Sequence, residues 1–436
     1  MFHITIVQTS GYFIWNGGRT VCELVISGKR CLCGEVDIQG SKNAVLPILA
    51  ATLLTNETCV IHNCPRIADV EAAAEILRGL GASVNLDGNT VCVCAADISS
   101  NVIPKKLMEK MRSSVMFLGA VLGRTGEAIV CRPGGCRLGS RPIDIHISSL
   151  GRLGAKIEEA GDCIVCHLPE ARSDDITLLY PSVGATENIM LMCAGSGCSV
   201  RIYNAAREPE IVDLQNFLNL MGARICGAGT DCIIIRPSGG LGGAEYSVMP
   251  DRIVAATYAM AVAACGGEAL LKRAESEHMR LVLEVLKEIG CEIIEEDEGI
   301  RTAAFGRPKP VHMIKTMPYP GFPTDVQPML AAALATADGE SVICESIFDS
   351  RFGYAKELEK MGARISGGGS SIRIEGVPNL LGANTEAKDL RGGAALVIAA
   401  AAAAGITVIS GVEYINRGYE NIERDLSRLG ADILRI

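Results

Sequence analysis

The feature of this sequence that most constrains its fold is a short phrase that occurs six times along the chain. Each copy is five residues long. It begins with an apolar residue, continues with Gly, then Ala or Cys, then any residue, and ends with Val or Ile. The copies are centred on Gly81, Gly154, Gly222, Gly290, Gly362 and Gly430, and successive copies lie 68 to 73 residues apart. A period of this length is too long for a solenoid of single helix pairs, so it indicates a unit of several strands and helices that is used six times.

Each glycine of the phrase is predicted to end a helix, because glycine adopts the left-handed conformation of a helix C-terminus without a steric penalty. Before the fourth copy, apolar residues recur at helical spacing at Val282, Val285, Leu286 and Ile289. After the glycines, the pattern is that of a strand, a polar or Gly-containing turn and often a second strand. The repeated unit is therefore predicted to be a helix followed by a β-hairpin.

The position of the six copies also predicts the domain organisation. The chain has 436 residues, 48% of them hydrophobic and 4% aromatic, which is enough for roughly two or three domains. Three copies lie in each half, and the Gly-rich segment 237–243 separates the halves. We therefore expect two similar domains, with polar ligands bound in the cleft between them.

Charge and hydropathy exclude several classes of function. The net charge of −9 and the pI near 5.4 provide no overall positive field, which argues against nucleic acid as a partner. The apolar segment 392–409 consists mostly of small residues and closely follows Asp389 and Arg391, so it is predicted to be a buried helix rather than a membrane span. Residues 1–20 lack the pattern of a secretory signal. We expect a cytoplasmic protein without membrane insertion.

The eighteen cysteines of the chain predict neither a disulfide framework nor a metal centre. Those in segments 92–94 and 163–166 lie in strand-like runs, where a thiol can serve as a small apolar side chain. Disulfides would be unusual in the cytoplasm. Only Cys163, Cys166 and His167 cluster, and a zinc site would need a second pair of ligands at a compatible spacing. We therefore predict free thiols and no metal.

Two segments in the first half combine positive charge with a candidate reactive group. Lys42 stands where a helix is predicted to begin, and because helix starts favour anions it is a candidate phosphate or carboxylate contact; a solvated turn lysine is the alternative. Cys136 follows a Pro-Gly-Gly turn and is surrounded by Arg132, Arg137 and Arg141. Positive charge near a thiol favours the reactive thiolate, whereas an inert thiol in a solvated loop is the alternative.

The second half contains Arg351, Arg391 and Arg417 near predicted segment junctions, together with Asp325 after the turn 321–324. One such arginine would more often form a surface ion pair than contact a ligand. Three of them beside turn glycines or aromatic residues favour an anion site.

Taken in order, these motifs resemble those of the enolpyruvyl transferases, and most closely the UDP-N-acetylglucosamine 1-carboxyvinyltransferase family. The resemblance covers residues 22–436 and is carried by segments 41–43, 133–136, 141–146, 182–187, 250–252, 322–325, 389–391 and 417–420. It implies an α/β fold of two inside-out barrels, with helices within and sheets outside, built from six similar units. One domain would span 42–249 and carry the Cys136 loop, and the other would join 1–41 to 250–436. Residues 1–20 lie outside the family pattern.

The resemblance implies transfer of the enolpyruvyl group of phosphoenolpyruvate to the 3′-hydroxyl of UDP-N-acetylglucosamine with release of phosphate, the first committed step of peptidoglycan precursor synthesis, without a cofactor. In the family roles, Cys136 is the acid and the adduct-forming thiol that fosfomycin alkylates, and Asp325 takes the hydroxyl proton. The implied anion contacts are Lys42, Arg141 and Arg417 for the phosphate, Arg351 and Arg391 for the carboxylate, and Arg112.

The positions that match the family's nucleotide-sugar contacts are Asn43, Arg141, Pro142, Ile143, Asp144, Ile145, Ser182, Val183, Gly184, Thr324, Asp325 and Ile347. One departure is Tyr180-Pro181, where many members carry Lys-Val beside the diphosphate. Loss of that lysine predicts weaker UDP binding or an altered nucleotide preference.

Two alternatives remain at the level of the sequence. The related 5-enolpyruvylshikimate-3-phosphate synthases share the fold and the phosphoenolpyruvate chemistry but lack a Cys-bearing loop, so Cys136 argues against them. A catalytically weak paralogue that binds UDP-sugar as a regulator is a hypothesis of another class, motivated by Tyr180. The joint presence of Lys42, Cys136, Asp325, Arg391 and Arg417 argues against it.

Overall fold

The structure, a computed structural model, describes residues 22–131 and 143–436. In these ranges the strands form six sheets of four strands each, as the six copies of the repeated phrase predict. All six glycines of the phrase have positive φ angles, from 88° to 109°. The prediction that each of them ends a helix in the left-handed conformation is confirmed.

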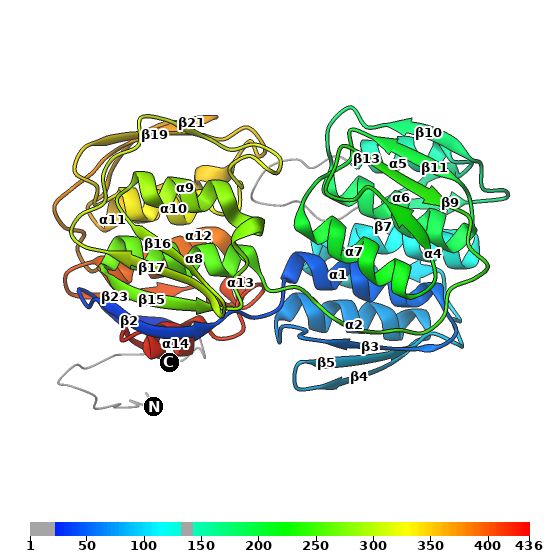
Figure 1. Cartoon of the computed structure of the whole chain (residues 1–436), viewed down its shortest axis with the longest axis horizontal. Helices are drawn as coiled ribbons and strands as arrows, with labels where there is room; N and C mark the ends of the chain where they lie inside the picture. Colours follow the sequence, from blue (N-terminus) through cyan, green and yellow to red (C-terminus); the bar gives the residue numbers. More distant parts are fainter. Residues whose placement is uncertain (1–21, 132–142) are drawn as a thin grey trace.

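The sheets and helices divide into two groups that lie side by side in Figure 1. The group on the right of the figure contains α1 (Lys42–Ala51), β3 (Thr58–His62), α2 (Ala68–Leu80), β4 (Ser83–Asp87), β5 (Thr90–Cys94), β6 (Val102–Ile103), α3 (Lys105–Lys110), α4 (Phe117–Thr125), β7 (Glu127–Cys131), α5 (Asp144–Arg152), β8 (Lys156–Ala160), β9 (Cys163–His167), β10 (Asp174–Thr177), α6 (Val183–Ser196), β11 (Val200–Tyr203), α7 (Pro209–Leu220), β12 (Arg224–Cys226), β13 (Cys232–Arg236) and β14 (Glu245–Ser247).

The group on the left contains the N-terminal strands and the second half of the chain. Its elements are β1 (Leu24–Ser27), β2 (Leu32–Asp37), α8 (Arg252–Cys265), β15 (Gly267–Lys272), α9 (Arg280–Glu288), β16 (Glu292–Glu296), β17 (Gly299–Ala304), β18 (Ile314–Lys315), α10 (Gln327–Leu334), β19 (Glu340–Cys344), α11 (Ala355–Lys360), β20 (Arg364–Gly368), β21 (Ser371–Glu375), β22 (Asn384–Glu386), α12 (Leu390–Ala402), β23 (Ile406–Ser410), α13 (Val412–Ile415), α14 (Ile422–Arg428) and β24 (Asp432–Arg435).

The six sheets share one topology. In the order β18-β19-β21-β20, the first two strands are parallel and the other neighbours are antiparallel, and β20 and β21 form the hairpin that follows the helix stop. In three sheets one strand comes from a distant part of the chain: β14 pairs with β3, β2 pairs with β15, and β1 lies between β23 and β24. The pairings of β1 and β2 join the N-terminal strands to the second half of the chain.

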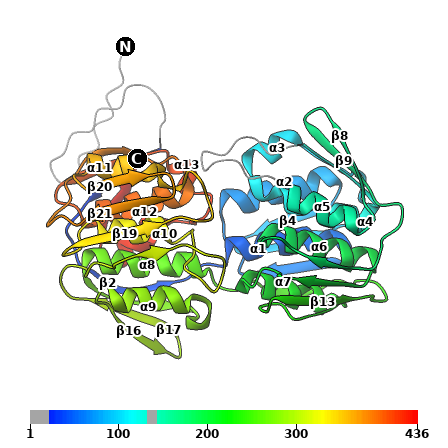
Figure 2. The ribbon, with the colours of Figure 1, turned by 90° about the horizontal axis from the view of Figure 1, so that it is seen from above.

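Each group encloses helices that are apolar on all sides. In the second group α8, α10 and α12 pack against one another, and nearly every residue of each is buried. A helix that is apolar all round must lie in a core. Figure 2 shows these helices inside and the strands outside, which confirms the inside-out barrel. The segment 392–409 forms most of α12 and then β23, and no helix in the described ranges is long and apolar enough to cross a bilayer.

Two separate hydrophobic cores stabilise the two groups. One contains buried residues between Ala44 and Met249, and the other joins Leu24–Ile38 to residues between Ile253 and Ile433. The chain passes between the groups twice, and the two passages are hydrogen-bonded to each other: Ser41 N donates to Met249 O at 2.8 Å, and Asp251 N donates to Gln39 O at 2.9 Å. We refer to this double connection as the hinge.

The prediction of free thiols is wrong at one place. Cys131 of β7 and Cys163 of β9 are joined as a disulfide, with their Cα atoms 3.8 Å apart. The two residues stand directly opposite each other at the ends of antiparallel strands, a register that brings side chains together. The sequence does not display this register, so Cys163 reads as one more apolar strand residue.

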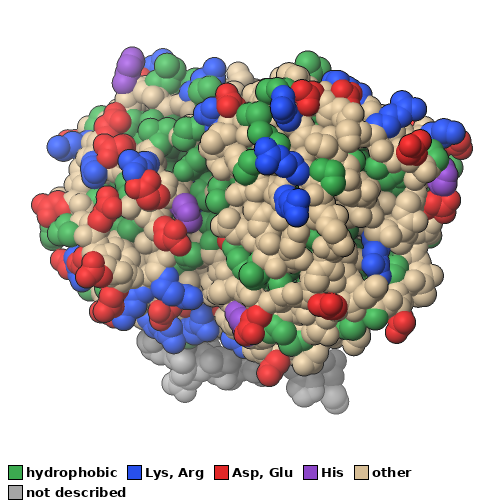
Figure 3. Space-filling view, turned by 45° about the vertical axis from the view of Figure 1, so that its right-hand side comes forward, with side chains coloured by type: hydrophobic (Ala, Val, Ile, Leu, Met, Phe, Trp, Pro, Cys, Tyr) green, Lys and Arg blue, Asp and Glu red, His purple; other side chains and the backbone are tan. Residues whose placement is uncertain are grey.

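The molecular surface carries both signs of charge. On the face shown in Figure 3, acidic and basic side chains are interspersed, except for a group of Lys and Arg side chains beside the grey residues. This face offers no broad basic track of the kind that follows a nucleic-acid backbone.

Candidate active site

Lys42 begins α1 at the hinge. The hydroxyl of Ser41 accepts a hydrogen bond from Ala44 N at 3.3 Å, and the carboxylate of Asp251 accepts from Lys42 N at 3.0 Å, so both sides of the hinge fix this helix start. The ammonium group of Lys42 is 12% exposed and lies 3.4 Å from the carboxylate of Asp69, while it donates to Asn43 at 3.3 Å. The cation is therefore held at a helix N-terminus, where an anion is favoured.

Arg417 reaches the same carboxylate from the other group of elements. Its Nε lies 2.9 Å from Asp69 Oδ1, and its Nη2 lies 3.2 Å from Asp69 Oδ2. Asp69 is only 3% exposed. Lys42 and Arg417, which the resemblance places at the phosphate, thus meet across the two domains on one buried carboxylate. No motif in the sequence pointed to Asp69.

Asp325 lies between the two other arginines. Arg351 Nη2 donates to Asp325 Oδ1 at 3.0 Å, and Arg391 Nε donates to Asp325 Oδ2 at 3.2 Å. Both arginines are 2% exposed, whereas Asp325 is 27% exposed. Burial alone would lower the pKa of Arg391, but the charge of Asp325 and those of Tyr419 and Asp251 raise it above its ordinary value. The carboxylate of Asp325 is therefore partly exposed to solvent, and the two guanidinium groups that hold it are buried.

The two clusters are connected. Arg391 Nη1 donates to the hydroxyl of Tyr419 at 3.4 Å, two residues beyond Arg417. Asp251 accepts a hydrogen bond from Lys42 N and also raises the pKa of Arg391. The Arg391–Tyr419 contact thus links the cluster of Asp325, Arg351 and Arg391 to the segment that carries Arg417, which meets Lys42 at Asp69.

Glu345 connects the segment with Thr324, before α10, to the segment with Ile347, after β19. No motif in the sequence pointed to this residue. It is 4% exposed and accepts hydrogen bonds from the hydroxyls of Thr316 and Thr324, each at 2.9 Å. It also accepts from Ile347 N at 2.8 Å and from Phe348 N at 3.2 Å. A buried carboxylate that accepts four hydrogen bonds restrains the groups that donate to it. Glu345 therefore holds Thr324 and Ile347 in fixed positions.

The predicted nucleotide-sugar positions of the first domain lie at the starts of α5 and α6. Ser182 caps α6 by accepting from Ala185 N at 3.3 Å. A side chain at Gly184 would meet the ring of His146 at 2.8 Å, so glycine allows α5 to lie against α6. Asn188 of α6 contacts His146 at 2.9 Å and donates to Val115 O at 3.2 Å. These contacts hold the start of α5, with Ile143, Asp144 and Ile145, and the 3₁₀ segment Arg112–Met116 beside α6.

The remaining predicted site residues Cys136, Arg141 and Pro142, with their neighbours Arg132 and Arg137, lie outside the described residues. The described chain stops at Cys131, at the end of β7, and resumes at Ile143, immediately before α5.

Three acidic residues occupy α6 and the start of α7: Glu187, Glu208 and Glu210. Burial raises the pKa of Glu187 well above its usual range, and the charges of Glu210 and Glu208 act in the same direction, whereas Lys42 lowers it. Burial also raises the pKa of Glu208. Glu210 forms a two-oxygen ion pair with Arg252 Nε at 3.0 and 3.2 Å. Burial and the charges of Glu208 and Glu345 raise the pKa of Tyr180, so Tyr180 stands near residues of both domains.

We expect His146 to make the stability of the fold depend on pH. Burial lowers its pKa from 6.5 to about 4, although the charge of Asp144 opposes the shift. The unfolded chain then binds more protons than the folded one between these two values, so stability is lost as the pH falls through this window. We expect His146→Gln to remove roughly 2–3 kcal/mol of the stability loss between pH 7.5 and pH 4.5. Urea denaturation of both proteins at the two pH values measures this, and equal losses would contradict it.

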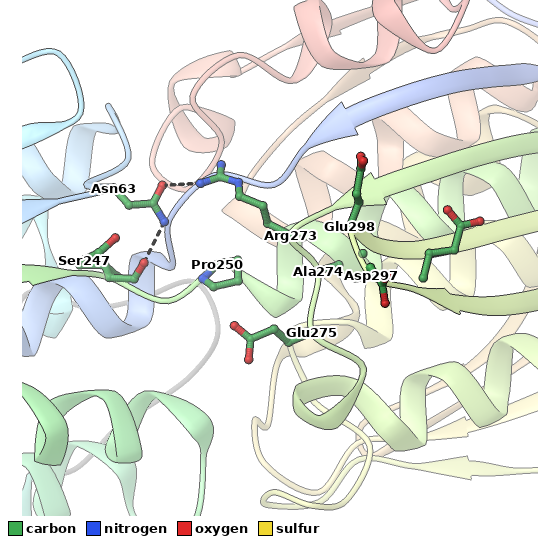
Figure 4. Close-up of a pocket in the computed structure, with 11 residues that line it drawn as sticks. Asn63, Ser247, Pro250, Arg273, Ala274, Glu275, Asp297 and Glu298 are labelled. Carbon is green, nitrogen blue, oxygen red and sulfur yellow. Dashed lines mark hydrogen bonds between the residues drawn. The ribbon is translucent and has the colours of Figure 1, made fainter.

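A cavity of about 400 Å³ lies at the hinge but contains none of the predicted site residues. Figure 4 shows Arg273 of the second domain reaching Asn63 of the first, opposite the acidic residues Glu275, Asp297 and Glu298. The Arg273–Asn63 hydrogen bond is 3.1 Å long. We assign the chemistry to the two clusters at Asp69 and Asp325, because positive charge gathers there and the cavity is predominantly acidic.

Comparison with known proteins identifies the family. The sequence model of EPSP synthase (3-phosphoshikimate 1-carboxyvinyltransferase) matches residues 26–426. The protein named UDP-N-acetylglucosamine 1-carboxyvinyltransferase 2 of Caldanaerobacter subterraneus subsp. tengcongensis is 49% identical over 411 residues, which are 94% of this chain and 99% of that protein. The UDP-N-acetylglucosamine 1-carboxyvinyltransferase of Thermotoga maritima is 45% identical over 415 residues, with 94% and 98% covered.

Solved structures agree with this assignment. The enolpyruvyl transferase NikO from Streptomyces tendae superposes with a TM-score of 0.85 at 26% identity, covering 95% of this chain and 99% of that one. EPSP synthase from Acinetobacter baumannii has the same fold, with a TM-score of 0.74 at 18% identity and coverage of 96% and 100%. The six-unit fold, the matching family model and the full-length relatives together show that this chain belongs to the enolpyruvyl transferase family, among the UDP-N-acetylglucosamine 1-carboxyvinyltransferases.

Proposed function

We propose that this protein transfers the enolpyruvyl group of phosphoenolpyruvate to the 3′-hydroxyl of UDP-N-acetylglucosamine and releases phosphate, in peptidoglycan precursor synthesis. The observation that carries the proposal is the convergence of Lys42 and Arg417 on Asp69, together with a second cluster in which two buried arginines hold Asp325. Such an arrangement suits a substrate with two anionic groups and an acceptor hydroxyl that must lose a proton. The names of the full-length relatives supply the substrates.

We take the roles of the described residues from the family resemblance, and the two clusters support them. Lys42 and Arg417 hold the phosphate, while Arg351 and Arg391 neutralise the carboxylate of phosphoenolpyruvate and the charge that develops during addition. Asp325 takes the proton of the attacking hydroxyl. The starts of α5 and α6, with Thr324 and Ile347 across the cleft, bind the nucleotide sugar. Domain closure about the hinge brings the two sets together.

Cys136 supplies the proton that the methylene carbon of phosphoenolpyruvate receives as the hydroxyl attacks. We expect Cys136→Ser to keep the fold and to reduce turnover by about 10²–10⁴-fold, the usual contribution of a general acid. Phosphate release and circular dichroism of both proteins measure this. Unchanged turnover would remove Cys136 from the mechanism.

The test of the function itself is phosphate release from phosphoenolpyruvate, with UDP-N-acetylglucosamine or shikimate 3-phosphate as the acceptor, before and after exposure to fosfomycin. Release with the UDP-sugar alone, lost after the drug, is the expected result. Release with shikimate 3-phosphate would instead assign the reaction of the EPSP synthases. Binding of the UDP-sugar without any release would favour a regulatory paralogue.

We propose further that residues 42–249 form one domain and that the N-terminal strands with residues 250–436 form the other, a division supported by the two hydrophobic cores. We infer a cytoplasmic location, because both proposed substrates are phosphorylated metabolites that do not cross membranes unaided.

A further inference from the structure

The start of α2 is held by the opposite domain. Its N-cap residue, Ile67, offers no side-chain acceptor to the amides of the first turn. Instead, Ala68 N donates to Asn416 O at 3.1 Å, and Arg66 N donates to the carboxylate of Glu420 at 2.9 Å. Amides at a helix start need acceptors from elsewhere, so the segment 416–420 of the second domain completes this helix of the first.

Asp69 stands in the first turn of the same helix and faces the same segment. It is 3% exposed and is one of the two acidic residues in this first turn. Its two oxygens engage Arg417 at 2.9 and 3.2 Å, and Oδ2 also lies 3.4 Å from Lys42 Nζ. One carboxylate thus fixes the guanidinium of one domain and the ammonium of the other.

We propose that Asp69 is a positioning residue that assembles Lys42 and Arg417 into a phosphate site before the substrate arrives. This rests on the proposed function, in which these two cations hold the phosphate. Without the carboxylate, the two cations would repel each other and Arg417 would lose its bidentate partner. Part of the free energy of phosphate binding would then be spent on ordering the two side chains. With Asp69 in place, the cluster carries one net positive charge, and the ammonium group of Lys42 and the guanidinium group of Arg417 are already positioned to bind the phosphate.

The test compares Asp69→Asn with the parent protein. We expect the KM for phosphoenolpyruvate to rise about tenfold or more, because hydrogen bonds between charged groups are lost. We expect the KM for UDP-N-acetylglucosamine to stay within about twofold, because the effect acts only on the phosphate site. A merely structural loss would lower the active fraction and leave both KM values unchanged. The matched control is Asp174→Asn, whose carboxylate accepts from Arg152 at 3.1 Å on the surface.

Calorimetric titration with inorganic phosphate separates this inference from the proposed function, because it requires no turnover. Weaker phosphate binding by Asp69→Asn supports the positioning role even if the parent protein releases no phosphate from phosphoenolpyruvate. Equal or tighter binding overturns it, since Asp69 would then be indifferent to the anion or compete with it. If Asp69→Asn fails to fold, the same titration is made with Asp69→Glu, with Arg417→Lys and with the two changes combined. Non-additive losses support action through Arg417, and additive losses overturn it.

Discussion

Replacing Asp325 with Asn is expected to reduce phosphate release by about 10²–10⁴-fold while binding of UDP-N-acetylglucosamine is kept. Asn has the same shape and can still accept a hydrogen bond from Arg351 or Arg391, but it cannot take a proton from the attacking hydroxyl. The 27% exposure of Asp325, against 2% for both arginines, places the carboxylate rather than the guanidinium groups toward the acceptor. Initial rates at saturating phosphoenolpyruvate measure the loss, and calorimetry measures retained binding.

A control variant and a stability measurement accompany this test. Asp338→Asn is the control, because Asp338 also pairs with an arginine, Arg307 at 3.0 Å, but is 80% exposed; its turnover should equal that of the parent protein. Thermal unfolding checks that the loss at Asp325 is chemical, because two buried arginines lose a charge partner in the variant. Turnover within about tenfold of the parent would mean that another group accepts the proton.

Replacing Glu210 with Ala is expected to produce the largest loss of stability. Glu210 of α7 is 2% exposed and Arg252 of α8 is 8% exposed, so the variant leaves a guanidinium group buried between the domains without its two-oxygen partner. Breaking a buried pair in this way costs about 3–5 kcal/mol. For a protein of 436 residues we expect the Tm to fall by roughly 3–5 °C.

Differential scanning calorimetry measures that shift. Glu277→Ala is the matched control, because Glu277 pairs with Arg280 on the surface, where the side chains are 70% and 71% exposed, and its Tm should stay nearly unchanged. Similar Tm values for the two variants would show that Glu208, whose charge also acts on Arg252, replaces Glu210 as its partner.

The two predictions illustrate which parts of the site could be read from the sequence. Asp325, Arg391 and Arg417 were identified because they stand in motifs of turn glycines and aromatic residues. Their partners were not, because Asp69 and Arg417 are 348 positions apart and no local pattern relates them. Glu345 has no motif either, since a buried acid in a strand end reads as an ordinary surface residue until its four donors are seen.

The sequence by itself determined the six units, because the left-handed φ of a helix stop is a local property that glycine satisfies wherever it occurs. It also determined that the segment 392–409 would be buried, because a run of small apolar residues has no polar face to expose. Only the tertiary structure decided the Cys131–Cys163 disulfide, the Glu210–Arg252 pair and the meeting of Lys42 and Arg417 at Asp69. Each of these depends on strand register or domain contact, and such long-range geometry leaves no period in the chain.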